Sequence, residues 1–518
     1  MPAQSLTFEI VEFSEAKLDE LLSQSSSTSL HEVKARPHTV YFHEYFKKLK
    51  ASTILVERHY VDHDYREDYA GFYSRCFRSY SRDCARLHFF AEKIVASHFE
   101  MLLRGDNSKL SKHDLQRPDN YLGFIVIKPI PKTFVGKTCL LTYPEELERR
   151  FPITRDYAVN LFGIPLSVNT IAFQEQDLSV SACATSALWA AFQGTGKLFQ
   201  HSIPTPIAIT QIAMTGQPSR NRALPNEGLS LEHMAHAING IGLEPVWIDA
   251  RPVNNQQLQG TIYAYTKGRI PVLLIGHIND AKTNKTLGLH AVAVCGFKVC
   301  NSAPCLPDQK TGFLVEATRL SKIYAHDDQV GPFAKMEFKS ASGLPDWLTT
   351  SHSDSSGSQS RMKFATICVL VPVSRSIRLP FSVIRTVVMR FDSTVETARA
   401  AIKNHPFIER FSWEIFLISV NEYKSTLLEA NDVDPDTKAI ALQTPMPLFL
   451  WCARLRYGQT RILDLLFDTT DIKQGQLLVK HIEYEPSVCQ WLKRISAKIN
   501  TKLEDSVQSA IWDHLSDA

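Results

Sequence analysis

Residues 181–194, SACATSALWAAFQG, place one cysteine after small residues and directly before an apolar helical pattern. The large apolar residues recur at the three- to four-residue spacing of one helix face: Leu188, Trp189 and Phe192. This spacing predicts a helix over 184–193, which Gly194 and Gly196 would end. Cys183 would then stand at the helix N-terminus.

Cys183 is a candidate nucleophile because of that position. A thiol at a helix N-terminus faces unpaired backbone N–H groups and the positive end of the helix dipole, and both favour the thiolate. Its small neighbours would let a substrate approach closely: Ser179, Ser181, Ala182, Ala184 and Thr185. The alternative is a buried cysteine that only fills space at a helix start. A base and a carboxylate elsewhere in the chain would favour the nucleophile.

His290 is the best candidate for the base that nucleophilic cysteine chemistry requires. In GLHAVAVCGF (288–297) it precedes alternating Val292 and Val294, so it would begin a core strand that presents the imidazole rigidly. A core histidine with only structural contacts is the alternative. Three other histidines suit the role less, because they lie on a predicted helix or in a polar turn: His233, His236 and His277.

A carboxylate must hold the imidazole in its useful tautomer. KIYAHDD (322–328) reads as a strand that runs into a polar turn, and it offers Asp327 and Asp328. If Ile323 faces the core, strand alternation puts Asp327 on the same side and turns Asp328 away. We therefore expect Asp327 to be the partner of His290.

The oxyanion hole would combine the backbone N–H of Cys183 with a side-chain donor just upstream. FQEQDLSVSAC (173–183) supplies Gln174 and Gln176, of which Gln176 is the preferred candidate. A solvated loop glutamine is the alternative.

The ordered set of these features resembles the papain-like cysteine peptidase superfamily. The order is a glutamine, a cysteine that opens a helix, the helix SLEHMAHAINGIG capped by Ser230, then IPVLLI, LHAVAVCGF and IYAHDD. Within the superfamily the nearest pattern is the bacterial branch that includes the leader-cleaving peptidase domains of bacteriocin exporters. The resemblance covers about residues 174–338.

The resemblance implies a papain-like fold, in which a helix carrying the cysteine packs on an antiparallel sheet. It also implies cleavage of an amide bond through a thioester, with Gln176 as oxyanion donor, Cys183 as nucleophile, His290 as base and Asp327 as its orienting group. The chain departs from the family pattern at three places. Ala184 follows the cysteine where glycine is common, Gln176 is one residue further from the cysteine than usual, and the gap from His290 to Asp327 is long.

Length and composition bound the organisation of the chain. Its 518 residues suggest several domains, and 44% hydrophobic against 21% charged residues is typical of a globular protein. Two Ser-rich stretches, 23–29 and 349–361, indicate flexible loops or linkers. We expect an N-terminal α/β domain over 1–150, an α+β papain-like domain over 151–348, a linker or loop over 349–361 and a C-terminal α/β domain over 362–518.

Several further elements are predicted from periodicity. Residues 85–103 and 413–430 each read as a helix, and the final segment from 486 is helical. Strands are expected at the following runs: 52–65, 120–131, 244–250, 270–278, 288–297, 312–318, 322–328, 363–373, 447–457 and 460–470.

Charge, apolar runs and cysteines exclude other classes of function. A net charge of +3 gives no bulk field for nucleic acid, and the longest apolar runs are far too short for a membrane helix. The N-terminus does not read as a signal peptide, so we expect a cytoplasmic protein. The ten cysteines lack the spacing of a disulfide framework, and a metal site at Cys295, Cys300 and Cys305 is the minority interpretation. No cofactor is expected.

Three hypotheses follow. The first is a cytoplasmic cysteine peptidase that cleaves a protein or peptide substrate, with flanking regions that recognise the substrate or restrain the enzyme. The second keeps the same triad but transfers the acyl group to an amine, as transglutaminase-like and arylamine acetyltransferase-like enzymes do. The third is a non-catalytic interaction module.

Overall fold

The computed structural model has a mixed α+β fold, as expected. It describes residues 8–144, 148–177, 182–215, 228–251, 254–339, 347–350, 362–401, 407–470, 477–499 and 506–516. Two compact units make up the chain, and each is built from several segments. Unit 1 comprises Met1–Arg251, Pro271–Gly296 and Lys322–Pro372, and unit 2 comprises Pro252–Ile270, Phe297–Ser321 and Val373–Ala518.

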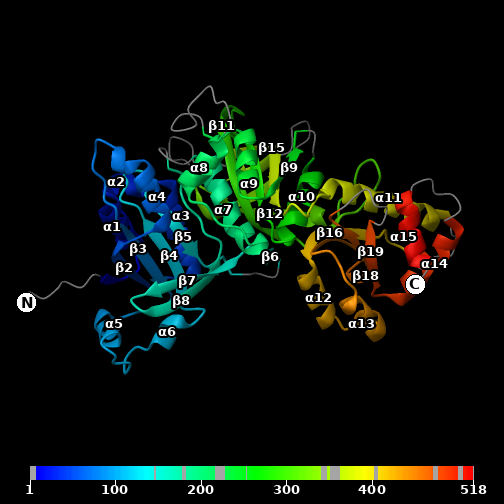
Figure 1. The fold of residues 1–518 in the computed structure, drawn as a ribbon, viewed down its shortest axis with the longest axis horizontal. Coiled ribbons are helices and arrows are strands. Elements are labelled where there is room, and N and C mark those ends of the chain that lie inside the picture. Colours follow the sequence, from blue (N-terminus) through cyan, green and yellow to red (C-terminus); the bar gives the residue numbers. More distant parts are fainter. Residues whose placement is uncertain are drawn as a thin grey trace, which may run out of the picture. The chain divides into compact units, whose positions relative to one another are not determined.

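An antiparallel five-stranded sheet forms the N-terminal part of unit 1 (Figure 1). Its strands lie in chain order: β1 (Phe8–Glu12), β2 (Thr53–Tyr60), β3 (Cys84–Phe90), β4 (Tyr121–Ile127) and β5 (Val135–Leu140). Alternate residues of a strand face opposite sides. Ile54 and Val56 pack in one core cluster with Leu18 and Phe46 of the flanking helices, whereas Leu55 packs in a second cluster. Both faces of the sheet are therefore covered.

Helices follow and separate these strands. They are α1 (Glu15–Ser26), α2 (Leu30–Ala35), α3 (Pro37–Leu49), α4 (His63–Gly71), η1 (Tyr73–Arg75), α5 (Ala96–Leu103) and α6 (Lys112–Gln116). The prediction of one helix over 85–103 is wrong, because its first part is strand β3 and only its end is α5. Every residue of β3 is buried between β2 and β4, so cross-strand pairing overrides the helical spacing.

A six-stranded antiparallel barrel forms the second half of unit 1. Its strands are β10 (Val272–Asn279), β11 (Thr286–Val299), β12 (Leu320–Asp327), β13 (Gly331–Lys339), β14 (Trp347–Thr350) and β15 (Met362–Val373), and β15 closes on β10. β9 (Glu244–Asp249) adds to β15, and β6 (Arg149–Arg150) pairs with β11.

A separate hairpin joins β7 (Arg155–Leu161) to β8 (Ile164–Thr170). Most of the linker expected over 349–361 lies outside the described residues.

Three helices complete unit 1: α7 (Cys183–Phe199), α8 (Pro206–Met214) and α9 (Leu231–Gly240). The prediction that Gly194 and Gly196 end the first of them is wrong, since α7 continues to Phe199 and is capped by Gln200, whose φ of 56° is left-handed. A Cβ on Gly194 would lie 2.8 Å from Ile153 Cγ2, so the glycine permits close packing instead of ending the helix. Ser230 caps α9 as expected.

Unit 2 contains an antiparallel sheet in the order β16 (Ser412–Ser419), β17 (Phe449–Tyr457), β18 (Thr460–Asp468) and β19 (Leu478–Glu483). Its helices are α10 (Asn255–Lys267), η3 (Glu316–Arg319), α11 (Phe381–Ala401), α12 (Val420–Glu429), α13 (Pro435–Gln443), α14 (Pro486–Ile499) and α15 (Ser506–Ser516). None of the helices in the described part of the chain has the length and apolar character needed to cross a membrane.

Two predictions within unit 2 are wrong. The helix expected over 413–430 is strand β16 followed by α12, because Ser419 caps a new helix and the preceding residues pair with β17. The strand expected over 312–318 contains only isolated bridges and then η3. The strands expected at 447–457 and 460–470 are confirmed as β17 and β18.

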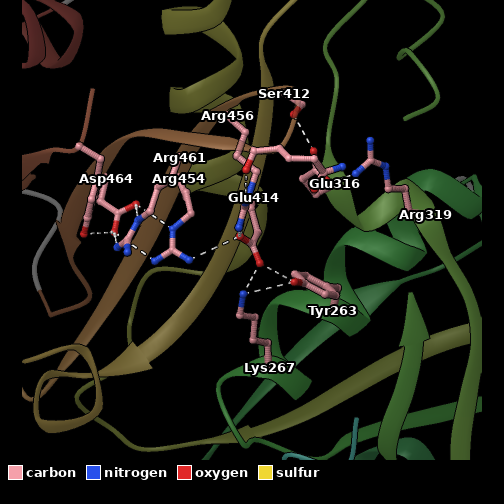
Figure 2. Close-up of polar contacts among 12 residues, drawn as sticks. Tyr263, Lys267, Glu316, Arg319, Ser412, Glu414, Arg454, Arg456, Arg461 and Asp464 are labelled. Carbon is pink, nitrogen blue, oxygen red and sulfur yellow. Dashed lines mark hydrogen bonds and ion pairs between the residues drawn. The ribbon is translucent and has the colours of Figure 1, made fainter. Parts of the chain in front are cut away.

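Unit 2 buries a charged network at the start of its sheet (Figure 2). Glu414 on β16 accepts hydrogen bonds from Lys267 and from Tyr263, and it also pairs with Arg456 at 2.9 Å. Arg454 lies between Glu414 and Asp464, at 3.7 Å and 2.9 Å. Burial alone would raise the pKa of Glu414, but these cations hold it well below its ordinary value. The network joins α10 to the sheet.

Removing the charge of Glu414 should destabilise unit 2. Glu414→Gln leaves Lys267 and Arg454 with less compensation in a buried site, so we expect a loss of about 3 kcal/mol in the free energy of unfolding. Urea denaturation measures it. Glu422→Gln removes the half-exposed pair with Arg269 and is the matched control, expected to change little. Equal effects of the two variants would contradict a structural role for the network.

Gly194→Ala tests the packing of α7. In an open helix this change is stabilising, but here the added Cβ would meet Ile153 and, at 2.9 Å, Pro271 Cγ. We expect a loss of about 1–3 kcal/mol in the free energy of unfolding. Gly288→Ala is the control, since its Cβ would meet nothing within 4 Å. A Gly194→Ala protein as stable as the wild type would show that the contact relaxes without cost.

Candidate functional site

Cys183 is the first residue of α7 and is half-buried. The preceding residue, Ala182, has an extended backbone and offers no capping side chain to the helix. The N–H groups of the first turn therefore point out of the helix beside the thiol. Three large residues of α7 are fully buried: Leu188, Trp189 and Phe192. Their packing in the core fixes the position of the helix N-terminus.

His290 lies on β11, at the point where that strand enters the core. The residues from Thr286 to Leu289 are exposed, and His290 is the first buried residue, with 2% of its surface exposed. Its backbone pairs with Gly276 on β10. His290 Nε2 donates to Asp327 Oδ1 at 2.9 Å. Because Nε2 is bound to Asp327, Nδ1 is the ring nitrogen that can form a hydrogen bond with the Cys183 thiol.

Asp327 is the last residue of β12 and is buried. A tight turn follows, in which Val330 N–H donates to the Asp327 carbonyl and Gln329 N–H donates to Asp327 Oδ1 at 3.1 Å. The carboxylate is therefore held by its own turn while it accepts from His290. Asp328 was expected to face away, but its Oδ1 lies 3.7 Å from His290 Nε2. A register shift between Ala325 and Asp327 disturbs the strict alternation on which that expectation depended.

His290 interacts with three side chains of the site: Asp327, Cys183 and Asp328. Burial alone would lower the pKa of His290, but the Asp327 carboxylate raises it well above its ordinary value, with further contributions from a hydrogen bond between His290 and Cys183 and from Asp328. The structure thus brings together three of the four predicted site residues: Cys183, His290 and Asp327.

Gln176 is the predicted site residue that no hydrogen bond joins to the other three within the described part of the chain. It is half-buried, and no hydrogen bond of its side chain is found among the described residues, which stop at 177 and resume at 182. Gln174 is buried, and its amide nitrogen has no hydrogen-bond partner within the described part of the chain. Both glutamines therefore stay candidates for the oxyanion donor.

The segment that carries these glutamines is anchored at both ends. Phe173 bridges Thr138 on β5, and Asp177 accepts from Tyr73 Oη and lies 3.5 Å from Lys128 Nζ. All of these partners come from the N-terminal part of the chain. No local pattern predicts these contacts, because the partners lie far away along the chain.

His290, Asp327 and Asp328 could also ligate a cation, since one donor atom from each lies within 4.8 Å of the others. This is the one such group of three found among the described residues. Cys295, Cys300 and Cys305 do not form one. Cys300 lies beside Ser302, and the Cys305 thiol contacts Glu316.

Comparison of the chain with protein-family models, with curated proteins and with solved structures found no match.

Replacing Asp327 tests which carboxylate controls His290. Asp327→Asn should lower the pKa of His290, because the nearest negative charge is removed, and Asp328→Asn should lower it less, since its oxygen lies 3.7 Å away instead of 2.9 Å. NMR titration of ring-labelled histidine measures both. An equal fall in the two variants would contradict the assignment.

The same pair predicts how stability depends on pH. The pKa of His290 is raised in the folded state, so its charge stabilises the fold fully below the unfolded value of about 6.5. This contribution is lost as the pH rises through the folded-state pKa. Asp327→Asn should flatten that part of the profile of unfolding free energy against pH.

Proposed function

We propose that the chain is a cytoplasmic papain-like cysteine peptidase, which cleaves an amide bond in a protein or peptide substrate through a thioester at Cys183. The observation that carries the proposal is the contact of one buried histidine with two groups. His290 donates to Asp327 through Nε2 and is hydrogen-bonded to the thiol at the start of α7. A nucleophile and an orienting carboxylate that both contact one base form the minimal set for acyl transfer chemistry.

The reaction would take place in two steps. His290 accepts the proton of the Cys183 thiol as Sγ attacks the carbonyl carbon and the C–S bond forms. The C–N bond then breaks as His290 gives that proton to the leaving amine. Water then attacks the thioester as His290 accepts a proton from it, and the C–S bond breaks to release a carboxylic acid and restore the thiol. The first-turn N–H groups of α7, with Gln176 or Gln174, would stabilise the oxyanion.

The surroundings of the triad also support a peptide substrate. The start of β11 is an exposed extended strand, and Leu287 and Leu289 on it are each 54% exposed within three residues of His290. An extended chain could pair with such a strand and place apolar side chains against these leucines. The arrangement of a cysteine-bearing helix on an antiparallel sheet also agrees with the proposed papain-like architecture.

The proposal predicts that Cys183 is the fastest-reacting thiol of the ten. With iodoacetamide at low concentration, mass spectrometry should find Cys183 labelled about tenfold faster than Cys76 or Cys300, which are also partly exposed. His290→Ala should abolish this preference. Cys76→Ser is the matched control and should leave it intact. Equal labelling of all partly exposed thiols would refute the proposal.

Products distinguish the chemistry once labelling succeeds. A peptide library incubated with the wild type should give fragments with new carboxyl ends, and Cys183→Ser should give none. If products appear only when a primary amine is supplied, the acceptor is an amine and the enzyme is an acyltransferase. Labelling and cleavage that stop on treatment with a chelator would instead favour a cation at His290, Asp327 and Asp328.

A further inference from the structure

One peptide group next to the triad is hydrogen-bonded on both of its sides. The group joins Asp328 to Gln329. Its N–H donates to Asp327 Oδ1 at 3.1 Å, and its carbonyl accepts from His38 Nε2 at 2.8 Å. A continuous chain of hydrogen bonds therefore runs from His38 through this peptide to Asp327 and on to His290 Nε2. Each bond in such a chain polarises the next.

His38 is built into the site and is not an incidental neighbour. It is the second residue of α3, and only 2% of its surface is exposed. A carbonyl can only accept, so His38 Nε2 must carry the proton. The adjacent Tyr41 Oη donates to the carbonyl of Pro332 in the same hairpin, and the ring of Tyr41 fills the space where Gly331 has no side chain. Helix α3 thus contacts both sides of the turn that follows Asp327.

The other side of His38 faces the glutamine segment. His38 Nδ1 lies 3.8 Å from Glu175 Oε1, and Glu175 also pairs with Arg36. Glu175 Oε2 accepts from Val135 N–H at 3.1 Å, which fixes the carboxylate on the edge of β5. Glu175 is the neighbour of Gln174 and Gln176. His38 therefore touches both the turn of the triad carboxylate and the segment that carries the candidate oxyanion donors.

We propose that His38 is a positioning residue for the Cys183, His290 and Asp327 triad: it orients the Asp328–Gln329 peptide, which in turn holds Asp327 against His290. The inference rests on the proposed function only for its consequence in catalysis. The geometry from His38 to His290 stands independently of the reaction.

Two amide variants separate this role from simple packing. His38→Gln can place its amide nitrogen near the former Nε2 position and donate to the Asp328 carbonyl, whereas the shorter side chain of His38→Asn cannot reach it. In His38→Asn we expect the labelling rate of Cys183 to fall about tenfold and the pKa of His290 to move down towards its ordinary value. His38→Gln should keep both close to the wild type. Labelling by iodoacetamide across pH and NMR titration of His290 are the two measurements.

His88→Asn is the matched control, because His88 is equally buried in unit 1 but bonds to Tyr121 and Glu57 instead of the triad hairpin. It should leave the titration of His290 unchanged. Identical titration and labelling in His38→Gln and His38→Asn would overturn the inference. So would an equal effect of His88→Asn.

The two proposals fail in different ways. If Cys183 of the wild type shows no selective labelling, the proposed function fails, and the titration of His290 still decides whether His38 positions Asp327. If labelling is selective but the two His38 variants do not differ, the inference fails and the proposed function stands.

Discussion

The hydrogen bond from His290 to Asp327 is the constraint around which unit 1 is organised. Both side chains are almost completely buried, and a buried carboxylate is costly unless it is paired and hydrogen-bonded. The fold meets this requirement twice, since Asp327 accepts from His290 Nε2 and from the N–H of Gln329 in its own turn. The barrel supplies both partners on neighbouring strands, β11 and β12.

The N-terminal sheet and the barrel share a core, which explains how residues near the start of the chain reach the site. One core cluster joins Phe46 and Phe89 of the N-terminal part to Tyr324 and Phe333 of the barrel. Helix α3 contributes to this cluster, and its His38 contacts the turn that follows Asp327. The N-terminal part therefore acts as a structural support of the site.

Local patterns in the sequence predicted the elements that carry the site better than those around it. His290 precedes alternating valines, and Asp327 follows a strand with a regular core face, so both positions could be predicted from period and turn chemistry. The helix expected over 85–103 failed because β3 is buried on both faces, and a strand without an exposed face loses its alternation. The prediction that Gly194 ends the helix failed because the glycine is required for close contact with Ile153, which depends on tertiary packing. Neither His38 nor Asp328 could be assigned, since one depends on a contact across 290 residues and the other on a bulge.

The two buried charged networks differ in the groups that face their carboxylates, and this difference suits one network to proton transfer and the other only to stability. In unit 2, Glu414 and Asp464 pair with three arginine side chains, Arg454, Arg456 and Arg461, which stay protonated across the physiological range. Such a network holds its protons. In unit 1 the carboxylates face a histidine, whose two ring nitrogens contact different partners and whose ordinary pKa of about 6.5 is far below that of arginine. The proton of His290 can therefore be exchanged within the folded site, and the half-buried thiol of Cys183 is its exchange partner.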